Sequence, residues 1–160
     1  MARDLGKEFE EHFKQDWIRT LPDKYIYRLV DVMSGFKGIA NVSDFIAHTN
    51  SKLFLIECKS HLGNTWPLTF RQYDDMVTAD HYSDVYPGVL LWFRDHAKVV
   101  WIPISEIKRM KSDGKKSVNI KMLKEKLYNI FEIPTETKRV YPKMDCTIFN
   151  TFEYKKNFVI

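Results

Sequence analysis

Apolar residues recur at every fourth position near the start of the chain and predict an amphipathic helix. Leu5, Phe9, Phe13 and Trp17 follow this spacing, and most residues between them are polar. Residues four positions apart lie on the same face of a helix, so the four side chains form one apolar stripe. We therefore expect an amphipathic helix over about residues 3–19.

The segments that follow alternate between strand-like and turn-like composition. Residues 25–32, 42–48 and 53–58 are rich in aromatic and β-branched side chains and predict strands. Residues 50–52 (Asn-Ser-Lys) have the composition of a turn. The second and third strands should therefore form a hairpin.

The rest of the chain continues the same mixture of elements. A helix, two strands and two short helices are predicted over about residues 69–82, 88–93, 98–104, 104–111 and 119–129. This order predicts an α/β fold with a mixed β-sheet flanked by α-helices. We see no repeat or linker, so we expect a single domain over residues 1–160, with its core in residues 3–130. The tail, residues 131–160, is aromatic and basic without a clear period, and its role is not predicted.

Composition narrows the class of protein. The 160 residues are 44% hydrophobic and 14% aromatic, which is typical of a globular domain and not of a disordered chain. No apolar run approaches the roughly 20 residues that a membrane-spanning helix needs. We see no apolar segment typical of a secretory signal, so we expect a cytoplasmic protein of a bacterium or a phage-infected cell.

Cysteine usage and charge restrict the chemistry further. Cys58 and Cys146 are the two cysteines, far apart and without ligand spacing, which argues against a zinc site or a disulfide framework. The net charge of +4 and a pI of about 8.9 are compatible with nucleic-acid binding but do not establish it.

Two carboxylates and a lysine form the main candidate site. Asp44 falls in one strand of the predicted hairpin, and Glu57 and Lys59 fall in the other. Because side chains alternate along a strand, Glu57 and Lys59 share a face while Cys58 points the other way. The hairpin would bring Asp44 beside them, so two carboxylates and an ammonium group meet at one edge of the sheet.

This set of groups suits phosphodiester hydrolysis. Carboxylate oxygens bind Mg²⁺, which neutralises a phosphate and makes a bound water more acidic. Lys59 could hold the attacking water, stabilise the phosphate in the transition state, or act as a base, and the sequence leaves these roles open. The spacing alone is a weak signal, because Glu and Lys are common on solvated strand faces. The buried run at residues 53–56 between the two acidic positions strengthens it.

Further candidates lie on the two predicted helices. Glu10 is either a site carboxylate or an ordinary acidic residue near a helix N-terminus. Gln72 is either aimed at the metal water or phosphate, or a surface amide. Arg3, Lys7 and Arg71 flank the proposed site and are candidate phosphate contacts in DNA.

Taken together, these residues resemble the RecU-type Holliday junction resolvases of the PD-(D/E)XK nuclease superfamily. The similar segments run in order between about residues 5 and 125. They are Gly-Lys-Glu-Phe-Glu at 6–10, Ser-Asp-Phe at 43–45, Ile-Glu-Cys-Lys at 56–59, Trp-Pro-Leu at 66–68 with Gln72, and Asp-Gly-Lys-Lys-Ser at 113–117.

The resemblance implies a restriction-endonuclease-like fold and a homodimer that cuts two opposing strands of four-way DNA junctions in recombination or repair. It implies Mg²⁺, with Mn²⁺ as a substitute. The implied catalytic residues are Glu10, Asp44, Glu57, Lys59 and Gln72. The implied metal ligands are Asp44, Glu57, the backbone carbonyl of Cys58 and, as a further ligand, Glu10.

One part of the family pattern differs here. Cellular relatives carry a long basic stalk between the first two core strands, whereas only residues 33–41 are available in this chain, with Lys37 as the obvious basic contact to DNA. Two other functions stay open: a restriction or repair endonuclease of the same fold, and a non-enzymatic DNA-binding protein of that fold.

Overall fold

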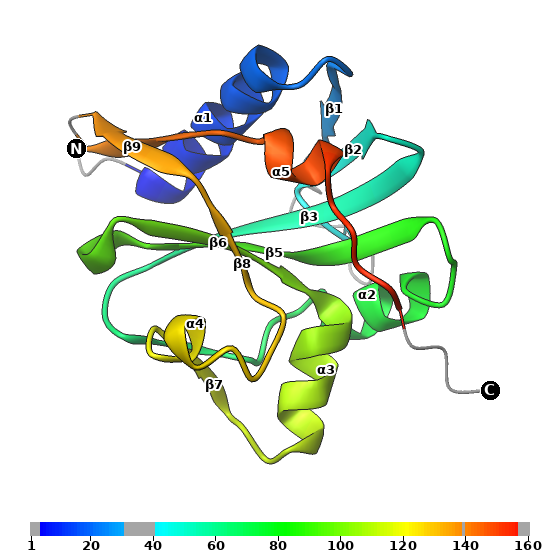
Figure 1. Ribbon diagram of the computed structural model, residues 1–160, viewed down its shortest axis with the longest axis vertical. Coiled ribbons are helices and arrows are strands. Elements are labelled where there is room, and N and C mark those ends of the chain that lie inside the picture. The colour runs from blue at the N-terminus through cyan, green and yellow to red at the C-terminus, as the bar shows by residue number, and fades with distance from the viewer. Residues whose placement is uncertain (1–3, 31–40, 139, 157–160) are drawn as a thin grey trace, which may run out of the picture.

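A six-stranded mixed sheet forms the centre of the computed structural model, which describes residues 4–30, 41–138 and 140–156 (Figure 1). Its strands, in spatial order, are β1 (Tyr25–Arg28), β2 (Phe45–Thr49), β3 (Lys52–His61), β5 (Val85–Phe93), β6 (Lys98–Pro103) and β8 (Phe131–Ile133). β3 and β5 are parallel, and the other neighbouring pairs are antiparallel. Helices cover both faces, so the predicted α/β class, a mixed sheet flanked by helices, is confirmed.

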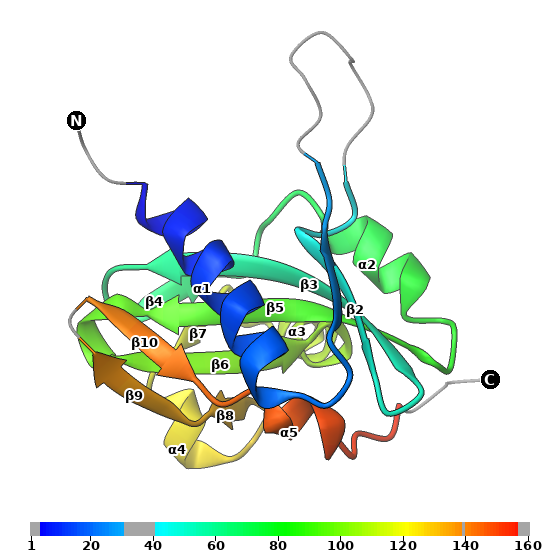
Figure 2. The same cartoon turned by 90° about the horizontal axis from the view of Figure 1, so that it is seen from above.

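The first helix packs against one face of the sheet as predicted. α1 (Leu5–Thr20) begins at Asp4, whose carboxylate accepts a hydrogen bond from the Lys7 amide at 3.1 Å and caps the helix. Phe9, Phe13 and Trp17 are fully buried in a core shared with β3 and the C-terminal segments. The predicted apolar stripe is therefore the surface that holds α1 on the sheet (Figure 2).

A second core lies on the opposite face. α2 (Tyr73–Ala79) and α3 (Ile104–Ser112) pack there against β5, and β4 (Thr65–Pro67) pairs with β7 (Ser117–Asn119) beside them. α4 (Met122–Glu125) follows β7. Among the helices of the described ranges, none has both the length and the apolar composition to cross a bilayer.

The predicted hairpin between β2 and β3 is confirmed. Asn50 and Ser51 form its turn with φ of 49° and 59°, the left-handed conformation at both positions that a tight two-residue turn requires. Phe45 pairs with Ile56 in the resulting register. This register places the residue before Phe45 alongside the residue after Ile56, and those two residues are the predicted carboxylates.

Some predicted elements were wrong in extent. The helix expected over residues 69–82 is α2 alone, Tyr73–Ala79. The Lys156 ammonium binds the backbone carbonyls of Asp80 and Tyr82, at 3.1 and 2.8 Å, where the helix was expected to continue. A distant side chain thus stabilises the end of the helix in a way that local pattern cannot reveal.

The helix expected over residues 119–129 is mostly absent. β7 occupies the start of this region, and α4 contributes only four residues. Val118 is fully buried and pairs with Trp66 of β4. Tertiary pairing therefore overrides the local helix preference. The strand expected over residues 25–32 ends at Arg28, and its last two positions fall outside the described residues.

The tail contributes directly to the first core. It forms β8, then the hairpin of β9 (Thr135–Lys138) and β10 (Tyr141–Met144), and then α5 (Thr147–Asn150). Phe149 and Phe152 are buried and contact the ring of Phe54, with centroids 5.2 and 5.7 Å away. Residues 135–152 thus cover the same face of the sheet as α1.

A glycine in the centre of the sheet gives a test of this packing. A Cβ at Gly88 would lie 2.5 Å from the carbonyl oxygen of Ile102 and 2.7 Å from the Trp101 ring. We expect Gly88→Ala to lower the free energy of unfolding by about 2–3 kcal/mol, measured by denaturant titration. The matched control is Gly6→Ala, because a Cβ there makes only an ordinary 3.4 Å contact. Equal stability of the two variants would contradict the packing around β5.

Candidate active site

Asp44 sits immediately before β2 and is held against β3. Its amide donates to the Ile56 carbonyl at 3.1 Å, which extends the pairing of the two strands by one residue. Its carboxylate oxygen Oδ2 accepts a hydrogen bond from the Cys58 amide at 2.8 Å. The Asp44 carboxylate is therefore fixed beside residues 57 and 58.

Glu57 and Lys59 lie on the same face of β3, as the alternation predicted. The Lys59 Nζ is 3.2 Å from Oε1 of Glu57. The Lys59 side chain keeps 32% of its surface exposed, whereas Glu57 is only 3% exposed. Cys58 points to the opposite face and is buried in the first core with Ile56. The structure thus brings Asp44, Glu57 and Lys59 together.

The second carboxylate oxygen of Glu57 distinguishes it from an ordinary buried acid. Its Oε2 is buried and has no hydrogen-bond partner among the described residues. Glu106 is equally buried, at 3% exposure, but its Oε1 accepts from Asn129 and Tyr154, and its Oε2 accepts twice from Arg109. Buried polar atoms in folded proteins are almost always hydrogen-bonded. The free oxygen of Glu57 is therefore available to a ligand.

Burial and neighbouring charge make Glu57 a weak acid. Its pKa is raised from the ordinary value of 4.5 to about 7, mainly by desolvation and then by the charge of the nearby Asp44 carboxylate. Lys59 opposes both effects through its charge and its hydrogen bond. Clustered carboxylates with a raised pKa are a common feature of functional sites.

Glu10 approaches the same cluster from α1. It contributes to the raised pKa of both Glu57 and Cys58. Its Oε2 accepts from Arg28, with the Nε and Nη2 atoms each at 2.8 Å. Arg28, at the end of β1, was not singled out from the sequence, because nothing in a single arginine after two tyrosines indicates a contact with a helix 18 residues earlier.

The thiol of Cys58 is not a nucleophile in this arrangement. Burial raises the pKa of Cys58 well above its usual range, and the carboxylates of Asp44, Glu10 and Glu57 raise it further. A protonated, buried thiol packs as a small apolar side chain.

Five predicted site residues remain, and the structure describes three of them. Gln72 precedes α2, is 8% exposed, and its Oε1 is buried without a hydrogen-bond partner in the described part of the chain. Lys7 and Arg71 are exposed. Arg3 and Lys37 lie outside the described residues. The roles of all five stay predictions.

The donor set fits one kind of metal ion. Within residues 4–30, 41–138 and 140–156, no three His, Cys, Asp or Glu side chains are grouped closely enough to form a complete cage. Mg²⁺ does not need one, since it keeps several waters and is bound by one or two carboxylates together with substrate phosphates. Asp44 and Glu57, with a free oxygen on Glu57, match that requirement.

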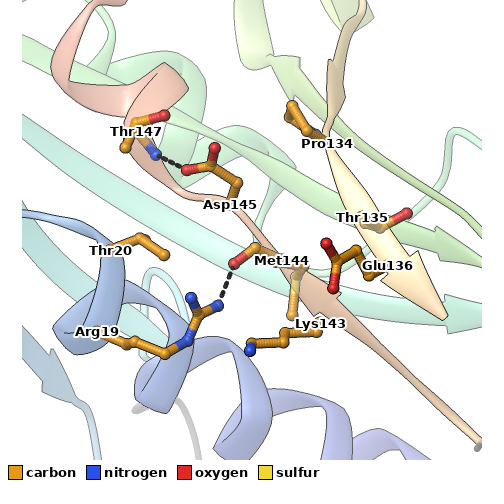
Figure 3. A pocket seen from close by; sticks show the side chains of 9 residues that line it. All are labelled: Arg19, Thr20, Pro134, Thr135, Glu136, Lys143, Met144, Asp145 and Thr147. Atoms are coloured by element: carbon orange, nitrogen blue, oxygen red, sulfur yellow. Dashed lines mark hydrogen bonds between the residues drawn. The ribbon is translucent and has the colours of Figure 1, made fainter. Parts of the chain in front are cut away.

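A pocket at the other end of α1 is separate from this cluster. It measures about 400 Å³ and lies between the C-terminus of α1 and the β9–β10 hairpin (Figure 3). Arg19 lines it but is already bonded to Asp16 at 3.0 Å and to the Met144 carbonyl at 2.9 Å. Asp145 accepts from the Thr147 amide at 3.0 Å. The Arg19 contact with Met144 thus holds the β9–β10 hairpin on α1.

The chain was compared with family models, curated proteins and solved structures. No family model and no curated protein match the sequence. Among solved structures, the chain is similar to Hjc, a Holliday junction resolvase from the archaeal hyperthermophile Archaeoglobus fulgidus. The two share 18% sequence identity with a TM-score of 0.49, and the match covers 71% of this chain and 88% of that one.

Proposed function

We propose that this chain is a metal-dependent endodeoxyribonuclease that resolves four-way DNA junctions by paired cleavage of opposing strands. The observation that carries the proposal is the buried Glu57 carboxylate, which has one oxygen on Lys59 and the other free, beside Asp44. A buried carboxylate oxygen without a partner lowers stability and is retained where a ligand completes it.

In this proposal each residue has a distinct task. Asp44 and Glu57 would hold Mg²⁺, with the Cys58 carbonyl as a further predicted ligand. Glu10, also a predicted ligand, is bound through its Oε2 to Arg28 in this structure, and this oxygen would have to leave Arg28 to reach the ion. The ion, when bound, neutralises the scissile phosphate and supplies a more acidic water. Lys59 places its ammonium beside the same point and stabilises the negative charge that builds up on the phosphate oxygens.

The choice of substrate rests on the sequence resemblance to RecU-type resolvases. Symmetric cleavage of a junction requires two active sites, so we expect a homodimer. Light scattering of the purified protein should give twice the 19.1 kDa mass of one chain.

The raised pKa of Glu57 makes metal binding depend on pH. An ion competes with the proton for this carboxylate, whose pKa is about 7. We expect the affinity for Mn²⁺ or Mg²⁺ to rise about tenfold per pH unit below pH 7 and to level off above it. Calorimetric titration between pH 5.5 and 8.5 measures this. An affinity independent of pH across that range would show that Glu57 is not a ligand.

Cleavage of two substrates tests the proposed activity. The protein is incubated with Mg²⁺ and either a labelled four-way junction or a linear duplex of the same arm sequence. We expect two symmetric nicks in the junction and little cutting of the duplex. Sequence-dependent cutting of the duplex without junction preference would instead indicate a restriction or repair enzyme. Binding without cleavage under any divalent ion would indicate a DNA-binding protein.

A further inference from the structure

A cavity of about 530 Å³ lies next to the carboxylate cluster, at the edge where parallel β3 and β5 end. Lys59 and Ser60 line it from the end of β3, and Arg94 lines it from the residue that follows β5. The start of α1 closes the remaining side. Lys59 belongs to both places, because its ammonium binds Glu57 at 3.2 Å while its side chain lines the cavity.

Two residues that line this cavity each carry a donor without a partner in the described part of the chain. The Oγ of Ser60 and the Nε of Arg94 are both buried, and neither makes a hydrogen bond to any described residue. These two atoms are buried although Ser60 and Arg94 are each only half-buried as residues, and a buried N–H or O–H group that is left unpaired needs an acceptor. The acceptor that suits a guanidinium best is an oxyanion, since its N–H groups match the geometry of phosphate or carboxylate oxygens.

The carboxylates of Asp95 and Asp4 are engaged elsewhere. Asp95 accepts from the Gly63 amide at 2.7 Å, and this bond ties the loop after β3 to the turn that carries Arg94. Asp4, which also lines the cavity, accepts from the Lys7 amide at 3.1 Å as the cap of α1. These two acidic side chains therefore already have hydrogen-bond donors.

We propose that Arg94 and Ser60 form a binding site for a DNA backbone phosphate adjacent to the scissile one. The proposal rests on the function proposed above, and it adds a positioning contact outside the metal cluster. Because Lys59 spans the two sites, a phosphate held by Arg94 would set the register of the strand across Asp44 and Glu57. Backbone contacts of this kind position DNA and carry no sequence preference.

Binding in EDTA tests this site without any cleavage. Fluorescence anisotropy with a labelled four-way junction is recorded over a range of salt concentrations for wild type, Arg94→Gln and Lys98→Gln. Lys98 is the control because it lies four residues away, outside the cavity, and pairs with Glu132. We expect Arg94→Gln to bind about tenfold more weakly. Its slope of log K against log salt should fall by about 0.9, the value for one lost phosphate contact. Lys98→Gln should retain the wild-type affinity and slope.

An uncharged analogue of a single DNA phosphate identifies the contact directly. Single methylphosphonates are placed one at a time around the cleavage position. One of them should weaken wild type and leave Arg94→Gln unaffected, because the two changes remove the same interaction. If Arg94→Gln fails to fold, as judged by circular dichroism, Ser60→Ala is used and should lose about threefold in affinity with an unchanged slope.

The outcomes separate the two proposals. If wild type cleaves junctions but Arg94→Gln and Ser60→Ala bind like wild type, the phosphate site is wrong and the nuclease proposal stands. If the slope of log K against log salt fell equally in Lys98→Gln, the phosphate site would also be contradicted. Such a result would show that the slope depends on the overall charge of the protein and not on one contact. If wild type binds no DNA, both proposals fail.

Discussion

Replacing Glu57 by glutamine is expected to stabilise the metal-free protein at high pH. The pKa of Glu57 is about 7 in the folded chain, against an ordinary value of 4.5. Below pH 4.5 the carboxyl is protonated in both the folded and the unfolded state, so its ionisation does not affect stability. Between pH 4.5 and 7 the unfolded chain releases this proton while the folded chain keeps it, and the free energy of unfolding falls as pH rises.

The size of the loss in free energy of unfolding follows from the pKa shift of Glu57. One pKa unit corresponds to about 1.4 kcal/mol, so the deficit levels off above pH 7 at about 3 kcal/mol. Glu57→Gln removes it, because glutamine does not ionise. We therefore expect the stability difference between variant and wild type to grow by about 3 kcal/mol from pH 4 to pH 8, in EDTA.

Denaturant titrations at several pH values measure the difference. Glu11→Gln is the matched control, because it removes an exposed carboxylate from α1 and should leave the pH dependence unchanged. If the free energy of unfolding changed with pH in the same way for wild type and Glu57→Gln, the carboxyl would ionise normally. The site would then not be a strained cluster.

Lys59→Gln is expected to slow cleavage by about 10²–10³-fold at saturating Mg²⁺. The ammonium lies 3.2 Å from Glu57 and, on this account, stabilises the charged phosphate in the transition state. Glutamine keeps a polar, nearly as long side chain without the charge, so the loss should appear in the rate of the chemical step and much less in junction affinity.

Single-turnover kinetics separate these quantities. Lys52→Gln is the control: it removes a lysine from the same strand, β3, at the opposite end from the site. We expect it to cleave at the wild-type rate. Cleavage by Lys59→Gln at that same rate would remove Lys59 from the mechanism.

The core of the site could be predicted because local rules set it. Strand alternation fixes Glu57 and Lys59 on one face, and the two-residue turn at Asn50 and Ser51 fixes the register that brings Asp44 beside them. Both rules act over fewer than 20 residues, so the patterns that they require can be recognised in the sequence.

Contacts between distant segments could not be predicted in the same way. The β9–β10 hairpin and α5 have no periodic pattern, and Phe149 and Phe152 are buried because Phe54 and the α1 residues lie opposite them. The same holds for the contact of Arg28 with Glu10 and for the position of Arg94 beside Ser60. These depend on the three-dimensional arrangement of elements that are each unremarkable in sequence.

The most direct test of the central claim is cleavage of a four-way junction by wild type, Glu57→Gln and Glu11→Gln, each in Mg²⁺ and in EDTA. We expect wild type and Glu11→Gln to cut in Mg²⁺ alone, and Glu57→Gln to be slower by at least about 10³-fold. Equal cleavage by Glu57→Gln and wild type, or cleavage by wild type in EDTA, would contradict the claim that these carboxylates hold a catalytic metal ion.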